Sequence, residues 1–359
     1  MQANNEIITT IGPNSLSPDI IKSLKAAGAT SYRINLSHSS PSLLDDYFSI
    51  IADQYVKPSL DTQGAQLRVL GEPRSKFFDD SAVLRISSAC SIKSGTADFL
   101  FSHPEFFQQV QPGDNLRVDS DGLVIKVIDV SPSDCSLTAS AINKGIVLPN
   151  KAVDVIGRQI ILDSLTQFDI SSIQKYGSDI ESLFLSFVNR LEDVQLARNL
   201  LAEAFPDAEL PRIIAKIESR LGIANLEKIL PYVDGILIDR GDLSREISIS
   251  RIPIATDAII SLCRTSSVPC YVATNVLDSM ILNRLPSRAE ISDLYNLYSR
   301  GVSGIVLAAE VAIGKYPVEC VHVVRHMHDL YRADKNCILA LLPESGLLGE
   351  LPESLANWL

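Results

Sequence analysis

RIIAKIESRLGIANLEKILPYVDGILIDRGDL, residues 212–243, decides the fold. It contains two short apolar runs, RIIAKIE (212–218) and GILIDR (235–240), and each is followed by a segment with helical periodicity. A strand, a helix and a second strand in this order form a βαβ unit, which makes the two strands parallel.

The same alternation continues on both sides of this stretch. Six further apolar runs precede helical segments, at 6–12, 30–37, 59–70, 183–188, 268–274 and 304–310. Eight such units in one domain favour a (β/α)8 TIM barrel, an α/β fold, over a doubly wound sheet. The absence of a glycine-rich dinucleotide or phosphate-binding signature after the first strand supports the barrel.

The alternation is interrupted over residues 71–149, where short β-branched segments are separated by the turn clusters PGD, SDG and SPSD. We predict a small all-β domain (71–149) inserted after the third strand of a discontinuous barrel (1–70 and 150–333). A C-terminal tail, 334–359, contains LPES twice. The tail either packs on the barrel or contacts a protein partner or a second subunit in a homo-oligomer.

The composition excludes several classes of protein. The 359 residues include 32 Lys and Arg against 43 Asp and Glu, a net charge of −11, and such an acidic chain is a poor nucleic-acid binder. No apolar run approaches the roughly 20 residues of a membrane-spanning helix, and the first residues do not resemble a secretory signal. The six cysteines form no CxxC pair, so we expect reduced thiols and a cytoplasmic location.

Active sites of such barrels lie at the C-terminal ends of the strands. We therefore expect the functional side chains among the polar residues that end the predicted strands. These are Arg33, Asn35, Ser37, Asp61, Thr62, Arg68, Lys216, Glu218, Asp239, Arg240, Gly241, Asp242, Thr274 and Glu310.

Two of these carboxylates indicate a metal site. Glu218 and Asp242 end adjacent strands, and a hard cation such as Mg²⁺ or Mn²⁺ prefers carboxylate oxygens. Lys216 lies two residues before Glu218, so strand alternation points both side chains the same way. An ammonium beside a divalent ion suits the stabilisation of negative charge on a phosphoryl or enolate oxygen. The alternative is that these inward charges form structural salt bridges.

The segments around these residues resemble the pyruvate kinase family over nearly all of residues 5–330. The matching segments are TTIGPNS (9–15), RINLSHSS (33–40), DTQGAQLR (61–68), NKGIVLPNKAVD (143–154), IIAKIESRLGIANLEKIL (213–230), VDGILIDRGDLSREI (233–247), VATNVLDSM (272–280) and PSRAEISD (286–293). The resemblance implies a barrel with a β-domain that closes over the site. It also implies the glycolytic reaction, a divalent-metal-dependent phosphoryl transfer between phosphoenolpyruvate and ADP or another nucleoside diphosphate, giving pyruvate.

The resemblance also implies a role for each matching residue. Glu218 and Asp242 would hold the divalent ion, Lys216 would stabilise the transferring phosphoryl group, and Arg33 would contact phosphate. Thr274 would lie near the carbon at which the enolate is protonated. The remaining roles concern a monovalent cation such as K⁺ (Asn35, Ser37, Asp61, Thr62), the substrate carboxylate (backbone amides of Gly241 and Asp242) and the nucleotide (His38, Arg68, Lys144).

The sequence departs from the family pattern at several of these positions. Asp239 replaces an alanine beside the carboxylate pocket, and like charges about 5 Å apart would weaken phosphoenolpyruvate binding by roughly two orders of magnitude. Asp239 would avoid this repulsion by pairing with Arg240 or by turning outward. The other departures are Gln63 for Lys, Gln66 for Glu, Ile291 for Gly, and Ala308, Ala309 and Val311 for Ser, Gly and Thr.

Three functions therefore compete. The first is the phosphoryl transfer itself. The second is a metal–enolate enzyme that acts on another 2-oxo acid, such as a decarboxylase or an aldol-type lyase. The third is a non-catalytic binding or assembly protein that uses the tail. The chain ends where the family's C-terminal domain would begin, so we expect no allosteric control through that domain.

Overall fold

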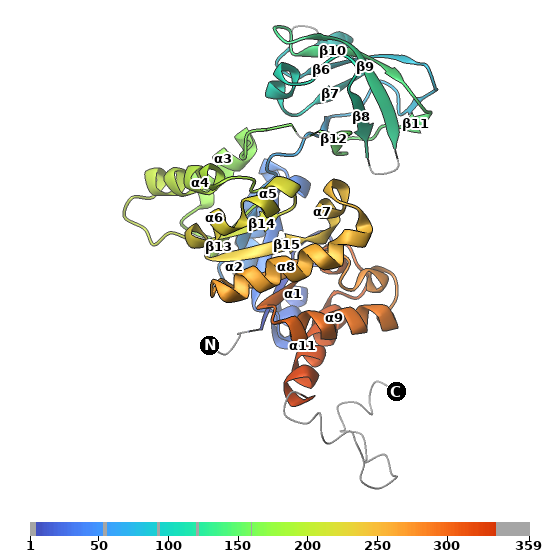
Figure 1. Cartoon of the computed structure of the whole chain (residues 1–359). Coiled ribbons are helices and arrows are strands. Elements are labelled where there is room, and N and C mark those ends of the chain that lie inside the picture. Colours follow the sequence, from blue (N-terminus) through green and yellow to red (C-terminus); the bar gives the residue numbers. More distant parts are fainter. Residues whose placement is uncertain (1–4, 53–55, 92–93, 120–121, 159, 335–359) are drawn as a thin grey trace.

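The computed structural model describes residues 5–52, 56–91, 94–119, 122–158 and 160–334. Apart from Asp334, the predicted C-terminal tail lies outside these residues. Eight parallel strands close into a barrel in the order β1-β17-β16-β15-β14-β13-β3-β2 (Figure 1). The strands are β1 (Glu6–Thr10), β2 (Ser31–Asn35), β3 (Ser59–Asp61), β13 (Ser182–Leu185), β14 (Arg212–Ile217), β15 (Gly235–Asp239), β16 (Cys270–Ala273) and β17 (Gly304–Leu307). The predicted fold class is confirmed.

Helices cover the outside of the barrel. They are α1 (Pro18–Ala27), α2 (Pro41–Ala52), α3 (Gln167–Tyr176), α4 (Leu191–Ala204), α5 (Arg220–Ala224), α6 (Leu226–Ile229), α7 (Arg240–Glu246), α8 (Ile252–Thr265), α9 (Arg288–Arg300), α10 (Ala309–Ala312) and α11 (Pro317–Asp334). The sequence fixes the ends of α1, because Ser17 caps its first turn and Gly28 adopts a left-handed φ of 116° after its last. Among the described residues, no helix is long and apolar enough to cross a membrane.

The interior of the barrel is packed with side chains. Seven buried residues fill it: Ile8, Phe184, Ile214, Leu237, Tyr271, Ala273 and Val306. A larger apolar core lies between the strands and the surrounding helices. Because the interior is filled, chemistry is confined to the rim of the barrel.

The inserted domain is built on a seven-stranded sheet in the order β12-β8-β9-β10-β6-β7-β4, and β5 pairs with β11 beside it. The strands are β4 (Val69–Leu70), β5 (Phe77–Phe78), β6 (Val83–Ser88), β7 (Phe99–Phe101), β8 (Asn115–Val118), β9 (Leu123–Ser131), β10 (Ser136–Ala141), β11 (Gly145–Ile146) and β12 (Val153–Val155). The sheet extends beyond the predicted 71–149, since β4 and β12 pair with β7 and β8. β4 lies within the apolar run predicted as the third barrel strand (59–70), and β12 follows the turn at Pro149–Asn150, where the predicted inserted domain ends, so the sequence pattern assigns both strands to the barrel.

The inserted domain stands at one end of the barrel, opposite the end of α11 (Figure 1). Asn150 in the returning segment donates from Nδ2 to the Ser37 carbonyl, 3.1 Å away, on the barrel rim. Asp154 on β12 accepts from Arg245 of α7 at 2.7 Å and from Arg117 of β8 at 3.4 Å. These contacts attach the inserted domain to the rim on which the predicted site lies.

Candidate active site

A cavity of about 490 Å³ opens at the C-terminal end of the barrel, and every barrel strand contributes a lining residue at or just after its end. Its volume lies in the usual range for small-molecule sites. The lining includes ten of the residues predicted for the site: Arg33, Asn35, Ser37, His38, Arg68, Lys216, Asp239, Gly241, Asp242 and Thr274. Asp61, Thr62 and Glu218 are buried beside the cavity.

Lys216 lies at the floor of the cavity, between two groups of polar side chains that form the two sides of the floor. The Nζ atom is 2.9 Å from Glu218 Oε1, 3.2 Å from Asp61 Oδ1 and 3.8 Å from Asp239 Oδ2. It also donates to Ser186 Oγ at 3.0 Å. Burial alone would lower the pKa of Lys216, but the surrounding carboxylates reverse this effect and raise it. Lys216 therefore remains a buried ammonium.

The first side of the floor, the paired side, consists of Arg33, Asp61 and Ser186. Arg33 Nη1 donates to Asp61 Oδ2 at 2.9 Å, and Nε and Nη2 donate to Thr10 Oγ1. Ser186 Oγ lies 3.1 Å from the other Asp61 oxygen, which also faces Lys216. Both oxygens of this buried carboxylate are thus engaged by groups of the chain.

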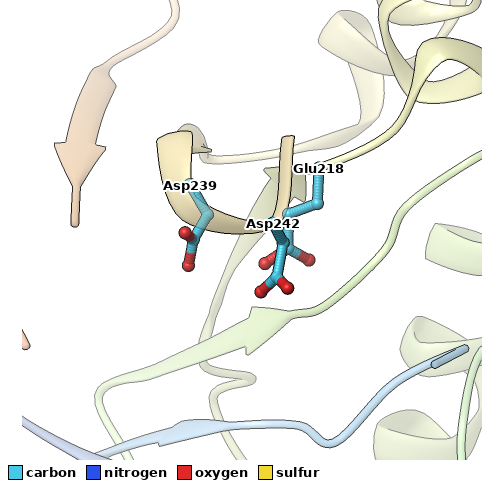
Figure 2. Close-up of side chains that lie close together, drawn as sticks. All are labelled: Glu218, Asp239 and Asp242. Carbon is cyan, nitrogen blue, oxygen red and sulfur yellow. The ribbon is translucent and has the colours of Figure 1, made fainter. Parts of the chain in front are cut away.

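The second side, the acidic side, consists of Glu218, Asp239 and Asp242. One oxygen atom from each lies within 4.8 Å of the others, and Figure 2 shows the three carboxylates beside the turn from β15 into α7. Burial raises the pKa of Glu218 to about 8; Lys216 opposes this shift, whereas Asp239 and Asp242 reinforce it. Burial, followed by the charge of Asp239, also raises the pKa of Asp242.

The acidic side fits a divalent cation. Its ligand atoms are all carboxylate oxygens, the donors that Mg²⁺ and Mn²⁺ prefer. Glu218 Oε1 is buried and has no well-directed hydrogen bond, although Lys216 lies close, while Oε2 accepts from the Phe187 amide at 2.6 Å. An ion beside Glu218 and Asp242 would satisfy this oxygen and relieve the repulsion between carboxylates.

The predicted monovalent-cation residues do not offer a comparable set of oxygens. Asp61 is engaged as described, and Asn35 Oδ1 accepts from the Ser37 amide at 2.8 Å. The Thr62 carbonyl accepts from Ser186 Oγ at 2.7 Å, and its hydroxyl accepts from the Ser186 amide at 2.9 Å. We therefore derive no step through a monovalent ion.

Of the three residues predicted to face the nucleotide, two line the cavity and one does not. His38 and Arg68 line the cavity, and Arg68 Nη1 donates to the Asn150 carbonyl at 3.0 Å. Lys144 instead lies exposed in the inserted domain between β10 and β11, and is not part of the cavity wall. Its proposed nucleotide contact stays a prediction.

Asp239 adopts neither of the two arrangements expected for it. It does not turn outward, since it is 6% exposed, and Arg240 pairs with Asp293 at 2.6 Å instead. Asp239 caps α7, and its Oδ1 accepts from the Gly241 amide at 3.2 Å and from Thr274 Oγ1 at 3.1 Å. The amide predicted to bind a substrate carboxylate is thus already in contact with a carboxylate of the chain.

A family model described as the pyruvate kinase barrel domain matches residues 2–321. The chain belongs to the pyruvate kinase family. A pyruvate kinase of Chlamydia pneumoniae is 32% identical over 94% of this chain and 70% of its own length. One of Hypocrea jecorina is 30% identical over 92% of this chain and 63% of its own length. A crystal structure of Cryptosporidium parvum pyruvate kinase matches with a TM-score of 0.82 and 25% identity, over 96% of this chain and 75% of that one.

Membership of the pyruvate kinase family was predicted, but some residues of the site were not. Ser186, which contacts both Asp61 and Lys216, directly follows β13 within an apolar run, and the strand-end rule could have identified it. Glu310, a predicted site residue, is instead buried and accepts from the Ala308 amide at 2.8 Å and the Leu277 amide at 3.2 Å. It stabilises the turn after β17.

Proposed function

We propose that this chain transfers a phosphoryl group between phosphoenolpyruvate and a nucleoside diphosphate, with a divalent ion held by Glu218 and Asp242. The observation that carries the proposal is the position of Lys216. Its ammonium lies on the cavity floor, 2.9 Å from Glu218 Oε1, next to carboxylates that fit the ion. Membership of the pyruvate kinase family supports the same reaction.

In the direction that forms pyruvate, the bond between phosphorus and the enol oxygen breaks. A new bond forms between phosphorus and a terminal oxygen of the diphosphate, and the enolate takes up a proton at its terminal carbon. Negative charge must be stabilised on the phosphoryl and enol oxygens during this transfer. The divalent ion, when bound, would supply part of that stabilisation as a Lewis acid.

The chain's own residues would supply the rest. Lys216 is held by Ser186, Asp61 and Glu218, so its charge is in place before a substrate arrives. The Arg33 contacts with Thr10 and Asp61 use three of the five N–H groups of its guanidinium, and the side chain lines the cavity. Arg33 would therefore present its remaining N–H groups to phosphate.

A ³¹P NMR time course with phosphoenolpyruvate, ADP and Mg²⁺ tests the proposal. We expect the phosphoenolpyruvate signal to be replaced by those of ATP. Lys216→Ala should slow this conversion by about 10²- to 10³-fold, because a preorganised charge at the transferring group is lost. Lys175→Ala removes an exposed lysine paired with Asp45 on the outer helices and is the matched control.

Two results would contradict phosphoryl transfer: a phosphorus spectrum that does not change with the unmodified chain, or equal rates for Lys216→Ala and the control. The acidic side would then be tested with 2-oxo acids that lack phosphate, since an enolate of such an acid uses the same kind of metal site. If the chain shows neither phosphoryl transfer nor activity on these 2-oxo acids, a binding or assembly role is favoured.

A further inference from the structure

Asp239 presents its carboxylate to the wall of the cavity. Its Oδ1 lies 3.2 Å from the Gly241 amide nitrogen and 3.1 Å from Thr274 Oγ1, and the same amide also lies 2.7 Å from that hydroxyl oxygen. Gly241 and Thr274 both line the cavity. The Thr274 hydroxyl also lies 2.7 Å from the Ala273 carbonyl oxygen. Polar groups that would otherwise face a ligand are therefore engaged by oxygens of the chain, the Asp239 carboxylate among them.

The surroundings of Asp239 hold this arrangement in place. Thr274 follows β16 with a left-handed φ of 63°, an uncommon conformation for a β-branched residue. The Arg240 guanidinium donates to the Thr274 carbonyl at 3.0 and 3.2 Å and pairs with Asp293 at 2.6 Å. Arg240 thus fixes the turn that carries the Thr274 hydroxyl, and its charge is directed toward Asp293.

The nearest described cation to Asp239 does not neutralise it fully. Lys216 Nζ lies 3.8 Å away and is closer to Glu218 and to Asp61. A ligand carboxylate that approached Gly241 and Thr274 would compete with Asp239 for the same donors and would meet its charge. Two like charges about 5 Å apart, at an effective dielectric near 20, correspond to roughly a 100-fold loss of affinity.

We propose that Asp239 is a specificity-determining residue that occupies the place of a substrate carboxylate and so weakens the binding of carboxylate-bearing ligands. This inference rests on the proposed function, because it concerns phosphoenolpyruvate in that site. The Asp239 carboxylate would compete with the substrate carboxylate for the same donors, so its removal should increase the affinity for phosphoenolpyruvate.

Asp239 could alternatively be a third ligand of the divalent ion, since its carboxylate lies within the acidic side. The contacts favour the first role, because Oδ1 is engaged by the Thr274 hydroxyl and the Gly241 amide. The two roles predict opposite changes in phosphoenolpyruvate affinity when Asp239 is removed, a gain for a competing carboxylate and a loss for a ligand of the ion, so one set of measurements separates them.

The test is calorimetric titration of the full chain and its variants with phosphoenolpyruvate in Mg²⁺, with Mg²⁺·ADP, and with Mn²⁺ alone. Asp239→Ala removes both the charge and the competing oxygen. Asp239→Asn removes the charge but keeps the size and a capping oxygen, so it preserves the start of α7. Asp257→Ala makes the same change of charge at an exposed position paired with Arg300.

We expect Asp239→Ala to bind phosphoenolpyruvate about 100-fold more tightly than the unmodified chain, and Asp239→Asn to show a smaller gain. Affinity for Mn²⁺ should fall in both Asp239 variants, because each loses a negative charge near Glu218 and Asp242, so phosphoenolpyruvate is titrated at saturating Mg²⁺. The gain should be smaller for Mg²⁺·ADP, which carries no carboxylate, and Asp257→Ala should behave as the unmodified chain.

Unchanged or weaker phosphoenolpyruvate affinity in both Asp239 variants at saturating Mg²⁺ would overturn the inference. Tighter binding without turnover in the phosphorus spectrum would support the inference and contradict phosphoryl transfer. If Asp239→Ala does not bind phosphoenolpyruvate at all, both proposals fail.

Discussion

The two sides of the cavity floor carry buried carboxylates in opposite electrostatic situations. On the paired side, Arg33, Lys216 and Ser186 engage both oxygens of Asp61. On the acidic side, three carboxylates lie together and share Lys216, and one oxygen of Glu218 lacks a directed hydrogen bond. The comparison indicates that the paired side is neutralised by the chain itself, whereas the acidic side keeps an excess of negative charge, as the proposed cation site requires.

We expect the largest effect from a substitution that breaks the ion pair of the paired side. Asp61→Asn should lower the free energy of unfolding by about 3–5 kcal/mol, because it removes one partner of a buried ion pair and leaves Arg33 without its carboxylate. Urea denaturation measures this difference. Asp257→Asn, which breaks an exposed pair with Arg300, should have a small effect, and equal losses in the two variants would contradict a special role for the paired side.

The acidic side should give the metal-free protein a characteristic pH dependence. The pKa of Glu218 is raised from 4.5 to about 8, so between these values the folded protein holds a proton that the unfolded chain has released. Stability in EDTA should therefore fall as pH rises from about 4.5 to about 8. Thermal unfolding across this range should show the decline, and Glu218→Gln should reduce it, leaving the part that the raised pKa of Asp242 contributes. A decline of the same size in Glu218→Gln would show that other groups cause it.

The smallest expected effect concerns monovalent ions. Because the Asp61 and Asn35 oxygens are engaged within the chain, we expect the midpoint of thermal unfolding to be the same in K⁺ and in tetramethylammonium at equal ionic strength. A clear stabilisation by K⁺ that is lost in Asp61→Asn would show that the paired side opens to hold the ion.

The fold and the acidic side could largely be predicted from the sequence, because both depend on regular spacing. Apolar runs marked the eight barrel strands, and the two-residue spacing of Lys216 and Glu218 correctly placed their charged atoms together. A single serine inside an apolar run is a weaker signal than a charged residue at a strand end, so Ser186 was missed. The orientation of the Asp239 side chain depends on its role as the N-cap of α7 and on the pairing of Arg240 with Asp293. Neither contact leaves a pattern in the local sequence, so this orientation could not be predicted.

The most direct test of the difference between the two sides is a titration with Mn²⁺ followed by electron paramagnetic resonance. We predict that the unmodified chain and Asp61→Asn bind one ion with similar affinity, and that Glu218→Gln and Asp242→Asn lose most of that affinity. Asp61→Asn would be checked by circular dichroism to show that it is folded. If Asp61→Asn loses the ion while Glu218→Gln keeps it, the assignment of the two sides is wrong.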